Sequence, residues 1–212
     1  MFGRTTAGYA RFLAALFLVS VLLPWLAMYS PVEMQIDKML LAPSGAHPLG
    51  TDELGRDVMS RVLHGFATTV TVSLGALISS LLIGAVVGAV SGYYYETWVD
   101  TVLGWVINLI MSLPFLLIIA SVLSLTQPSI AKAYVILTAI MWVHPARIVR
   151  AEVLKRMNLD YVLASRGLGS SDWRILSRTI LPASLEAAIT FSVSYLPELV
   201  ALEAGLSFLG LG

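Results

Sequence analysis

The stretch DYVLASRGLGSSDWRILSRTILPAS, residues 160–184, carries three arginines, two glycines and two aspartates and lies between two hydrophobic segments. The chain around it is apolar, since 58% of its 212 residues are hydrophobic and 12% are charged, with a mean hydropathy of +0.84. Soluble domains carry about twice that charged fraction, so the composition predicts a membrane protein. A polar, glycine-containing insert therefore interrupts a sequence that is otherwise suited to lipid.

Runs without Asp, Glu, Lys or Arg mark the candidate membrane spans, because a helix that crosses the bilayer core needs about 20 apolar residues. Four such runs lie at 12–32, 62–95, 101–131 and 133–146, and the last of them is short. A fifth apolar segment begins after Pro182 and contains three glutamates, so its hydropathy marks it only weakly. The sequence therefore predicts an all-α, polytopic membrane protein with about five transmembrane helices.

The first run follows Arg4 and Arg11, as the apolar part of a secretory signal or of a membrane anchor would. In a signal peptide that part is usually about 7–15 residues long, whereas this run has 21. The length favours a retained anchor. We expect a tail and first transmembrane helix in residues 1–32, an extracytoplasmic segment in 33–65 and a membrane core in 66–212.

Basic residues are unevenly distributed, and their distribution predicts the orientation. Residues 147–178 hold seven of the 13 Lys and Arg residues, and Arg4 and Arg11 precede the first span. Cytoplasmic loops carry an excess of Lys and Arg, and four spans separate these two regions, so we expect both in the cytoplasm. The segment 33–61 has five acidic residues beside three basic ones and is expected outside.

Small residues and prolines predict how the spans pack and where they bend. Gly84 and Gly88 form a GxxxG pair in a run of Gly, Ala and Ser, a pattern that lets two helix backbones approach closely in lipid. Such pairs are common in membrane helices, so the pair alone does not demand a specific contact. Pro114 is expected to kink or break the third span, and Pro145 to do the same near the end of the fourth.

Within the opening stretch, the order of residues predicts a helix, a hinge, a second helix and a stop. Asp160 opens a short apolar-faced helix, and Gly167 and Gly169 end it, as glycines do at helix C-termini. Residues 170–172 are all N-cap types and precede a second amphipathic segment, and Pro182 fits the first turn of the fifth span. A cationic helix on lipid headgroups would explain the arginines but not the glycine hinge. The small residues leave a surface that another protein could cover.

The same stretch resembles the coupling loop of the permeases of binding-protein-dependent ABC importers. The signature of that loop is Glu-Ala-Ala, three residues, Gly, nine residues and Ile-x-Leu-Pro. Leu163-Ala164-Ser165 stands at the Glu-Ala-Ala, Gly169 at the glycine and Thr179-Ile180-Leu181-Pro182 at the tail, with the same spacing throughout. Leu163, Ser165 and Thr179 depart from the signature. The missing acid at position 163 removes a salt bridge to a partner but not a contact based on shape.

Three longer stretches resemble one branch of these permeases, which serves dipeptides, oligopeptides and nickel. They are HPLGTDELGRDVMSRVLHG at 47–65, PARIVRAEVLKRMNLDYVLASRGLG at 145–169 and EAGLSFLGLG at 203–212. The resemblance covers nearly the whole chain in the same order. Permeases of this branch continue past the last stretch into a further loop and span, so we expect this chain to be truncated before the last helix of a normally six-helix fold.

The resemblance implies the permease subunit of an ATP-driven importer of di- and oligopeptides in a bacterial or archaeal cell membrane. In the family, the coupling loop, here residues 152–182, rests in a groove on a cytoplasmic ATPase. A nickel or metal-chelate importer of the same branch is the alternative, and a secondary transporter that works without ATPases is a further one. The implied partners are a second permease subunit that completes a heterodimer, two ATPase subunits, an extracytoplasmic substrate-binding protein and the lipid bilayer.

Several kinds of site are not expected in this chain. It has no Gly-x-x-x-x-Gly-Lys-Ser/Thr loop, so we expect no bound cofactor, and ATP and Mg²⁺ belong to the partner ATPases. It has no cysteine, and its three histidines match no compact set of metal ligands, so we interpret them as structural or solvated. No nucleophile–base pattern indicates an enzyme, and the basic residues are too few and too close to the membrane for nucleic-acid binding.

The residues expected to matter fall into two groups. Those of the coupling loop, implied by the resemblance, are Leu163, Ala164, Ser165, Gly167, Gly169, Asp172, Leu181 and Pro182. The candidates for the translocation path or for helix packing are Pro114, Glu198 and Glu203. An acid within a span is costly and marks a functional site by default, although an acid at the outer interface is the alternative for both glutamates.

A last group of charges lies in the outer segment. Asp52, Glu53, Arg56 and Asp57 lie within six positions of one another. They could pair with a docked binding protein or with one another, and a capped, solvated turn is the simpler interpretation of the same residues. The sequence leaves these alternatives open.

Overall fold

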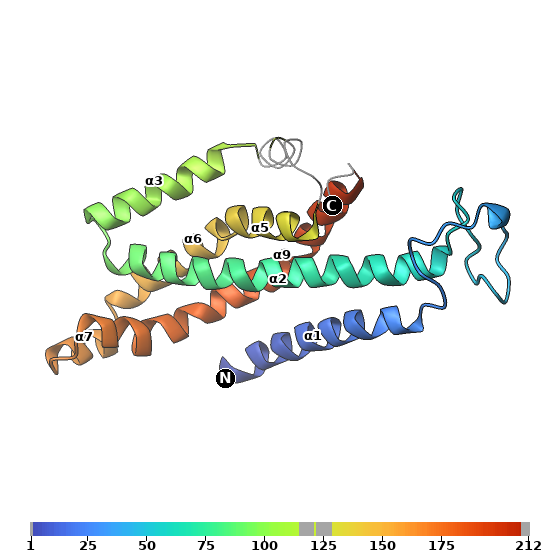
Figure 1. Ribbon diagram of the computed structural model, residues 1–212. Helices are drawn as coiled ribbons and strands as arrows, with labels where there is room; N and C mark the ends of the chain where they lie inside the picture. The colour runs from blue at the N-terminus through green and yellow to red at the C-terminus, as the bar shows by residue number, and fades with distance from the viewer. Residues whose placement is uncertain (1, 115–120, 122–128, 209–212) are drawn as a thin grey trace. The chain divides into compact units, whose positions relative to one another are not determined.

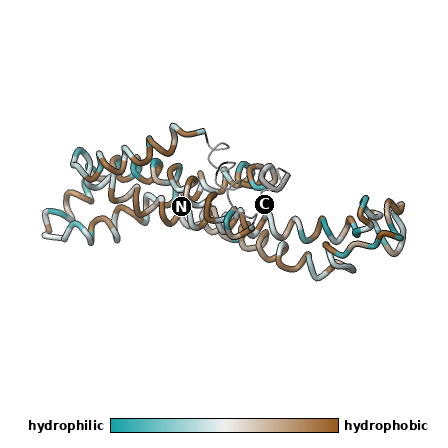
Figure 2. Tube along the Cα trace, turned by 45° about the horizontal axis from the view of Figure 1, so that its top comes forward, coloured by the Kyte–Doolittle hydropathy of each residue, from teal (hydrophilic) through white to brown (hydrophobic). Residues whose placement is uncertain are grey.

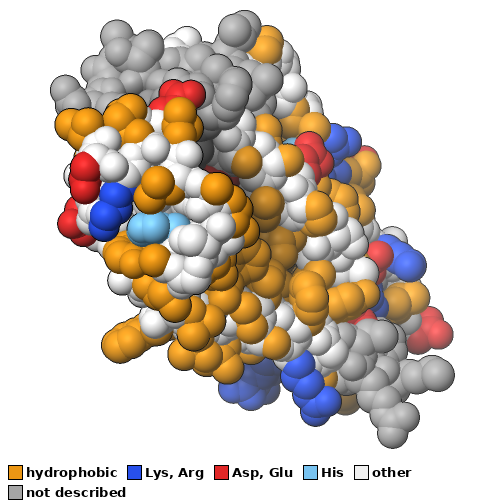
Figure 3. All heavy atoms as spheres, turned by 90° about the vertical axis from the view of Figure 1, so that its right-hand side faces the viewer, with side chains coloured by type: hydrophobic (Ala, Val, Ile, Leu, Met, Phe, Trp, Pro, Cys, Tyr) orange, Lys and Arg blue, Asp and Glu red, His pale blue; other side chains and the backbone are white. Residues whose placement is uncertain are grey.

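The computed structural model describes residues 2–114, 121 and 129–208, and most of these residues are helical (Figure 1). In the described part of the chain there is no β-strand, and only an isolated antiparallel bridge joins Thr51 to Asp57. The prediction of an all-α fold is confirmed. Hydrophobic residues predominate along the helices (Figure 2), and a space-filling view shows a face dominated by hydrophobic side chains (Figure 3).

The chain divides into two compact units, and each is described by itself. One unit comprises residues 10–74, and the other comprises residues 1–9 together with 75–212. The helix α2 (Val58–Tyr93) contributes its first half to the former and its second half to the latter.

The unit of residues 10–74 begins with most of α1 (Phe2–Leu22), followed by the 3-10 turn η1 (Leu23–Leu26). Residues 7–26 form a run of 20 residues that is apolar enough to cross a membrane, and only 6% of its most apolar window is buried. Because these apolar side chains are exposed, they are suited to contact lipid. The length of this run agrees with the predicted first span.

The segment between η1 and α2 is held by backbone hydrogen bonds and a buried polar cluster, and it contains the short turn η2 (Ile36–Lys38). The Thr51 N–H donates to the Leu41 carbonyl at 3.1 Å. Gly50 and Gly55 have φ values of +75° and +72°, a conformation that strains any residue with a Cβ. The sequence of this segment therefore specifies one folded turn rather than a flexible loop.

Asp57 is the N-cap of α2 and lies at the centre of the buried cluster. Its carboxylate accepts a hydrogen bond of 2.7 Å from the Ser60 N–H, three residues into the helix, and one of 2.9 Å from His47 Nδ1. The ring of His47 stacks on Tyr29 with 4.7 Å between centroids. The expected cap is present, but it is buried rather than solvated.

A second carboxylate, that of Asp52, organises the exposed turn beside this cluster. It accepts hydrogen bonds from the N–H groups of Leu54 and Arg56, each at 2.9 Å, and pairs with the side chains of Arg56 and Arg61. Asp52 and Arg56 thus pair with one another, which was one of the two alternatives left open.

The second unit contains the other helices whose bounds the structure describes. They are α3 (Trp98–Ser112), α5 (Ile130–Met141), α6 (Val143–Met157), α7 (Asp160–Gly167), α8 (Asp172–Arg174), the π-helical segment η3 (Ile175–Ile180) and α9 (Leu181–Phe208). The core of this unit lies where α2, α6, η3 and α9 meet. Its fully buried members are Val149, Val153, Val162, Ile175, Ile180 and Ala188.

The helices α2 and α6 are in backbone contact along a glycine face of α2. A Cβ on Gly84 would lie 2.7 Å from the Trp142 carbonyl oxygen, and a Cβ on Gly92 would lie 2.9 Å from the Arg150 carbonyl oxygen. A Cβ on Gly88, between them, would lie 2.9 Å from the Cβ of Val149. The GxxxG pair therefore makes a specific contact, and Gly92 extends its face by one further turn.

Two prolines interrupt helices where the sequence indicated. The helix α3 ends at Ser112, and Leu113, the residue before Pro114, is extended with ψ 134°, as the clash with a following proline ring requires. Near Pro145 the helix bends between α5 and α6, because this proline has no N–H to donate to the Met141 carbonyl. The bend is slight, since Trp142 between the two helices keeps helical dihedral angles.

Pro182 lies in the first turn of α9, as predicted, but it does not act as the predicted stop. Helical structure continues from Asp172 through η3 into α9, and the Leu181 N–H donates to the Leu176 carbonyl five residues back. A π-helical turn of this kind changes the hydrogen-bond register immediately before a residue that has no N–H. The helix thus passes through Pro182 instead of ending there.

Among the residues that the structure describes, three helical runs are long and apolar enough to span a membrane, at residues 7–26, 58–93 and 172–205, and α3 is a shorter apolar helix. These runs correspond to the first, second and fifth predicted spans. The predicted third span begins in α3 and continues into residues 115–128, most of which lie outside the described part. The predicted fourth span corresponds to α5 and the start of α6.

We expect Gly88→Ala to lower the unfolding temperature of the purified protein, because its methyl group would force α2 and α6 apart at a cost of roughly 1–3 kcal/mol. Gly104→Ala in α3 is the matched control, since no atom lies within 4 Å of its added Cβ and alanine favours helix over glycine. Thermal unfolding in detergent measures both. An equal response of the two variants would contradict the contact described for α2 and α6.

Because Asp57 caps α2 with an ionised carboxylate, the stability of the outer segment should decrease at low pH. Burial opposes the ionisation of Asp57, but hydrogen bonds from the Ser60 N–H and from His47 outweigh it and lower the pKa of this carboxyl below its ordinary value. Its stabilisation is therefore complete above about pH 4, the unfolded pKa, and is lost as the pH falls through the lowered folded pKa. Pepsin should cleave Asp57→Asn faster than the wild type at pH 4.5, and the difference should disappear at lower pH. The exposed Asp37→Asn is the control.

Candidate coupling surface and membrane pocket

The insert that opened the sequence analysis forms a short helix, a glycine cap and a second helical start. The helix α7 ends in a Schellman motif, in which the Ser170 N–H donates to the Ser165 carbonyl at 3.2 Å and the Gly169 N–H to the Arg166 carbonyl at 3.0 Å. Gly169 has the positive φ, +79°, that this motif requires. The predicted boundaries of the first helix are confirmed, and the glycine is explained by backbone geometry.

One side of this insert is anchored and the other is open. Val162 of α7 and Ile175 of η3 are fully buried in the core of the unit. By contrast, Leu163, Leu168 and Trp173 are 48%, 87% and 75% exposed, and no atom lies within 4 Å of a Cβ added at Gly167 or Gly169. We call the exposed residues 163–173 the coupling surface. Ala164 and Asp172 are exposed on it, and Ser165 is half-buried.

The coupling surface is tied to the end of α2. The Tyr93 hydroxyl, in the last turn of α2, donates a short hydrogen bond to the Asp172 carboxylate, and Arg166 donates to the same hydroxyl oxygen at 3.4 Å. The sequence indicated only that the insert is connected to the fifth span through Leu181 and Pro182. In the structure these residues begin α9, where Leu181 is half-buried and Pro182 is exposed. Tyr93 therefore adds a second connection that the motif did not indicate.

A partly buried ion pair joins α3 to α6 near the end of α2. Arg150 of α6 contacts both oxygens of the Asp100 carboxylate at 2.8 Å, and Ser91 of α2 donates to the same carboxylate at 2.6 Å. The Arg150 guanidinium also lies 5.5 Å from the centre of the Tyr95 ring. A bidentate pair of this kind fixes orientation as well as distance, so α2, α3 and α6 form a rigid support for the insert.

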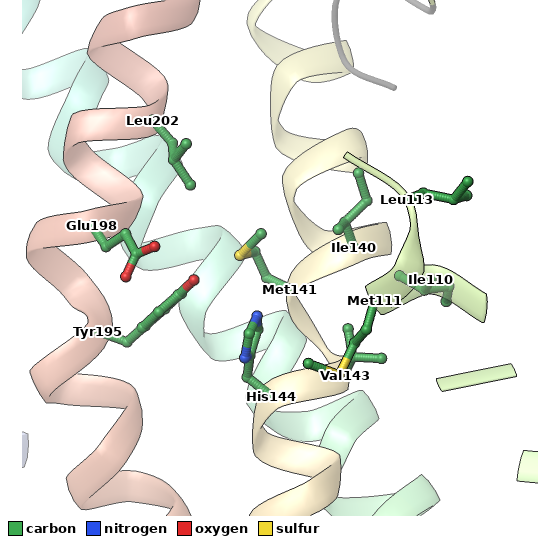
Figure 4. Close-up of a pocket in the computed structure, with 10 residues that line it drawn as sticks. All are labelled: Ile110, Met111, Leu113, Ile140, Met141, Val143, His144, Tyr195, Glu198 and Leu202. Carbon is green, nitrogen blue, oxygen red and sulfur yellow. The ribbon is translucent and has the colours of Figure 1, made fainter. Parts of the chain in front are cut away.

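A pocket of about 180 Å³ opens between α3, the α5–α6 bend and α9 (Figure 4). The lining residues are Ile110, Met111, Leu113, Ile140, Met141, Val143, His144, Tyr195, Glu198 and Leu202. Tyr195 and Glu198 point from α9 toward α6, and the break before Pro114 leaves Leu113 at the wall formed by α3. The end of α3 before Pro114 and the bend near Pro145 thus shape the pocket.

The two candidate acids of the fifth span have different surroundings. Glu198 lines the pocket and is exposed, whereas Glu203, five residues on, is 5% exposed and has an interaction within the chain. Placing a charge at the centre of a membrane helix costs about 2.5–3.5 kcal/mol, so a polar or aqueous surrounding stabilises the acid. The geometry favours path lining for Glu198 and helix packing for Glu203.

His144 is the residue of this pocket that sequence reasoning missed. Its ring lies 5.1 Å from the Tyr195 ring and 6.5 Å from that of Phe191, and the Phe191 and Tyr195 rings are 5.6 Å apart. The histidines were compared with metal-ligand spacings, and that comparison cannot detect an aromatic cluster between two helices. The sequence signal that could have drawn attention to His144 is its position in an apolar segment, two residues after Trp142 and directly before Pro145.

Sequence comparisons place this architecture among known proteins. Residues 80–212 match the family described as binding-protein-dependent transport system inner membrane component. The chain belongs to this family. The coupling surface, the pocket and all of α3 to α9 lie within the matched residues, so the family assignment covers the whole candidate site. The family is a membrane component of transport systems and not a group of enzymes.

Two relatives within this transport family show how much of such a protein the chain represents. The dipeptide transport system permease protein DppC of Bacillus subtilis is 37% identical over 197 residues, which are 93% of this chain and 61% of that protein. The glutathione transport system permease protein GsiD of Pectobacterium atrosepticum is 32% identical over 176 residues, which are 83% of this chain and 58% of that protein. The chain therefore spans about three fifths of the length of these relatives.

Removal of the Tyr93 hydroxyl should loosen the coupling surface. A hydrogen bond to a charged group contributes about 1.5–3 kcal/mol, so in Tyr93→Phe we expect amide hydrogens of α7 and α8 to exchange at least about tenfold faster. Exchange in α5 should stay unchanged. Tyr94→Phe, at the exposed neighbouring position, is the matched control for mass spectrometry of deuterium uptake. Unaltered exchange in α7 and α8 would show that Tyr93 does not hold the insert.

Proposed function

We propose that the chain is a transmembrane permease subunit of an ATP-driven importer of di- and oligopeptides. The observation that carries the proposal is the coupling surface, an exposed apolar and small-residue patch held by buried residues and by Tyr93. An exposed apolar patch on a rigid support is suited to bind a partner protein. The family match gives that partner a role, because members of the family work within larger transport systems.

In the proposed mechanism, cytoplasmic ATPase subunits bind the coupling surface and move it when they close on ATP. Movement of the insert would reach α9 through the continuous helix at Pro182 and α2 through Tyr93. ATPase binding changes the balance between two transporter conformations only if it contacts them differently. ATP and Mg²⁺ would bind to the ATPases, and this chain would bind no cofactor.

The orientation and the remaining partners follow from the same proposal. The coupling surface must face the cytoplasm, which agrees with the seven basic residues in 147–178 and puts the N-terminus on that side too. The folded segment around Asp57 would then face the outside, where a substrate-binding protein delivers its ligand. A second permease subunit would complete the translocation path as a heterodimer, in the membrane of a bacterium or archaeon.

Peptides are favoured over nickel as the substrate. The names of the two relatives refer to dipeptide and glutathione transport. In the part of the chain that the structure describes, no three His, Cys, Asp or Glu side chains are grouped closely enough to hold a metal ion. The pocket instead has apolar walls with a few polar groups, as sites for organic ligands have.

A substitution that introduces a positively charged side chain on the coupling surface tests the proposal. Ala164 is exposed on α7, and we expect Ala164→Arg to abolish co-purification with the ATPase subunits and peptide uptake while leaving membrane insertion intact. This position is better suited than Gly169, where any side chain would be strained by the positive φ. Gly45→Arg adds the same cation to an open position of the outer segment and should retain both properties. Normal ATPase binding by Ala164→Arg would refute the coupling role.

A further inference from the structure

The membrane pocket combines one acid, one imidazole and one phenol with otherwise apolar walls. Its ten lining residues include Glu198, His144 and Tyr195, and the other seven are Ile, Leu, Met or Val. In Figure 4 the carboxyl group of Glu198 and the hydroxyl end of Tyr195 project toward the side of α6 that carries His144. The polar groups of α9 and α6 therefore face one another across the pocket.

The carboxylate of Glu198 lines the pocket without forming an ion pair with any described residue. Within residues 2–114 and 129–208, no Lys, Arg or His side chain forms an ion pair with it. Asp100, in contrast, pairs with Arg150, and Glu152 pairs with Arg156. A carboxylate in a membrane helix is stabilised by an opposite charge nearby, so the pocket is complementary to a cation.

The surrounding rings indicate what kind of cation fits. The rings of His144, Phe191 and Tyr195 lie within 6.5 Å of one another, centre to centre. Aromatic faces attract organic ammonium groups, whereas a metal ion would require several oxygen, nitrogen or sulfur ligands at fixed positions. Pro197, beside Glu198, also cannot donate to the Val193 carbonyl, which leaves that oxygen without its usual helical donor.

Arg147 places a positive charge close to the pocket. Arg147 follows His144 by three residues on α6 and contacts the sulfur of Met111, a lining residue, at 3.2 Å. Both Glu198 and Arg147 interact electrostatically with His144. Glu198 and Arg147 form no ion pair with each other, and a positive charge close to the pocket suits a ligand that has negative or carbonyl oxygens beyond its ammonium group.

We propose that this pocket binds the protonated amino terminus of the transported peptide, with Glu198 as its counter-ion and the rings of His144 and Tyr195, backed by Phe191, in its walls. The inference rests on the proposed function, peptide import, and names the part of the substrate that the site recognises. Peptides of different sequence share their termini and not their side chains. A volume of about 180 Å³ is smaller than that of sites for whole drug-sized ligands, about 300–1,000 Å³, and so suits one end of a peptide.

The test compares a peptide with its N-acetylated form on the complete transport complex. The complex is placed in nanodiscs without binding protein or nucleotide, and equilibrium binding of radiolabelled alanyl-alanine and N-acetyl-alanyl-alanine is measured at pH 7. We expect the free-amino form to bind about tenfold tighter in the wild type. In Glu198→Gln its affinity should fall to that of the acetylated form, whose own affinity should not change. Glu198→Asp should retain most of the preference.

Two further measurements separate recognition from a structural role. Leu202→Ala, in the same pocket, should weaken both peptides equally, because it removes a contact and no charge. In the wild type, binding of alanyl-alanine should also weaken as the pH rises through about 8, where an α-amino group loses its proton, and this result requires no variant. Assembly of each variant is checked by co-purification with the ATPases.

Equal binding of the two peptides by the wild type, undiminished binding by Glu198→Gln, or no binding of either peptide would each overturn the inference. A failure of the proposed function is seen separately, in uptake by proteoliposomes that contain the complex, binding protein and ATP. Uptake of alanyl-alanine without any preference for its amino terminus would refute the role of Glu198 alone. A complex that takes up no peptide would refute the proposed function.

Discussion

The contact between α2 and α6 is the constraint on which the second unit depends. In lipid, two helices gain little from burying apolar side chains, so close van der Waals packing must hold them together. Gly84, Gly88 and Gly92 permit backbone contact with α6 over two turns of α2. Because α6 leads directly to α7 and carries His144, this one contact fixes both the coupling surface and a wall of the pocket. Any side chain on this face would displace both sites together.

Proline residues have a second, complementary role in this architecture. Each proline removes one backbone donor, and inside a membrane the freed carbonyl must be accommodated locally. The chain solves this in different ways at Pro114, where α3 ends, at Pro145, where the helix only bends, and at Pro182, where a π-helical turn precedes the ring. The first two shape the pocket, and the third keeps the insert continuous with α9, so that displacement of the insert is transmitted along an unbroken helix.

Local rules account for much of this structure from the sequence. The ends of α7, the glycine cap at Gly169 and the break at Pro114 each depend on neighbouring residues, and the sequence predicted all three. The Tyr93–Asp172 bond and the His144 cluster depend instead on which faces of distant helices meet, and no periodicity in one segment specifies that. Pro182 shows a different limit. A proline in a helix usually predicts an end or a kink, and the π-helical turn that overrides this rule has no simple sequence signature.

The placement of charges follows one physical logic throughout the second unit. Asp100 pairs with Arg150, and this pair joins two helices. The negative charge of the carboxylate is then neutralised within the chain. Lipid penalises an unpaired charge, so a carboxylate left without an ion pair in a membrane helix requires compensation from water, from another subunit or from a ligand. Among the described residues that line the pocket with Glu198 there is no Lys or Arg, and the rings of His144 and Tyr195 lie in the same pocket. A transported cation can supply the missing charge for as long as it occupies the site and then leave, which a permanent partner such as arginine could not do.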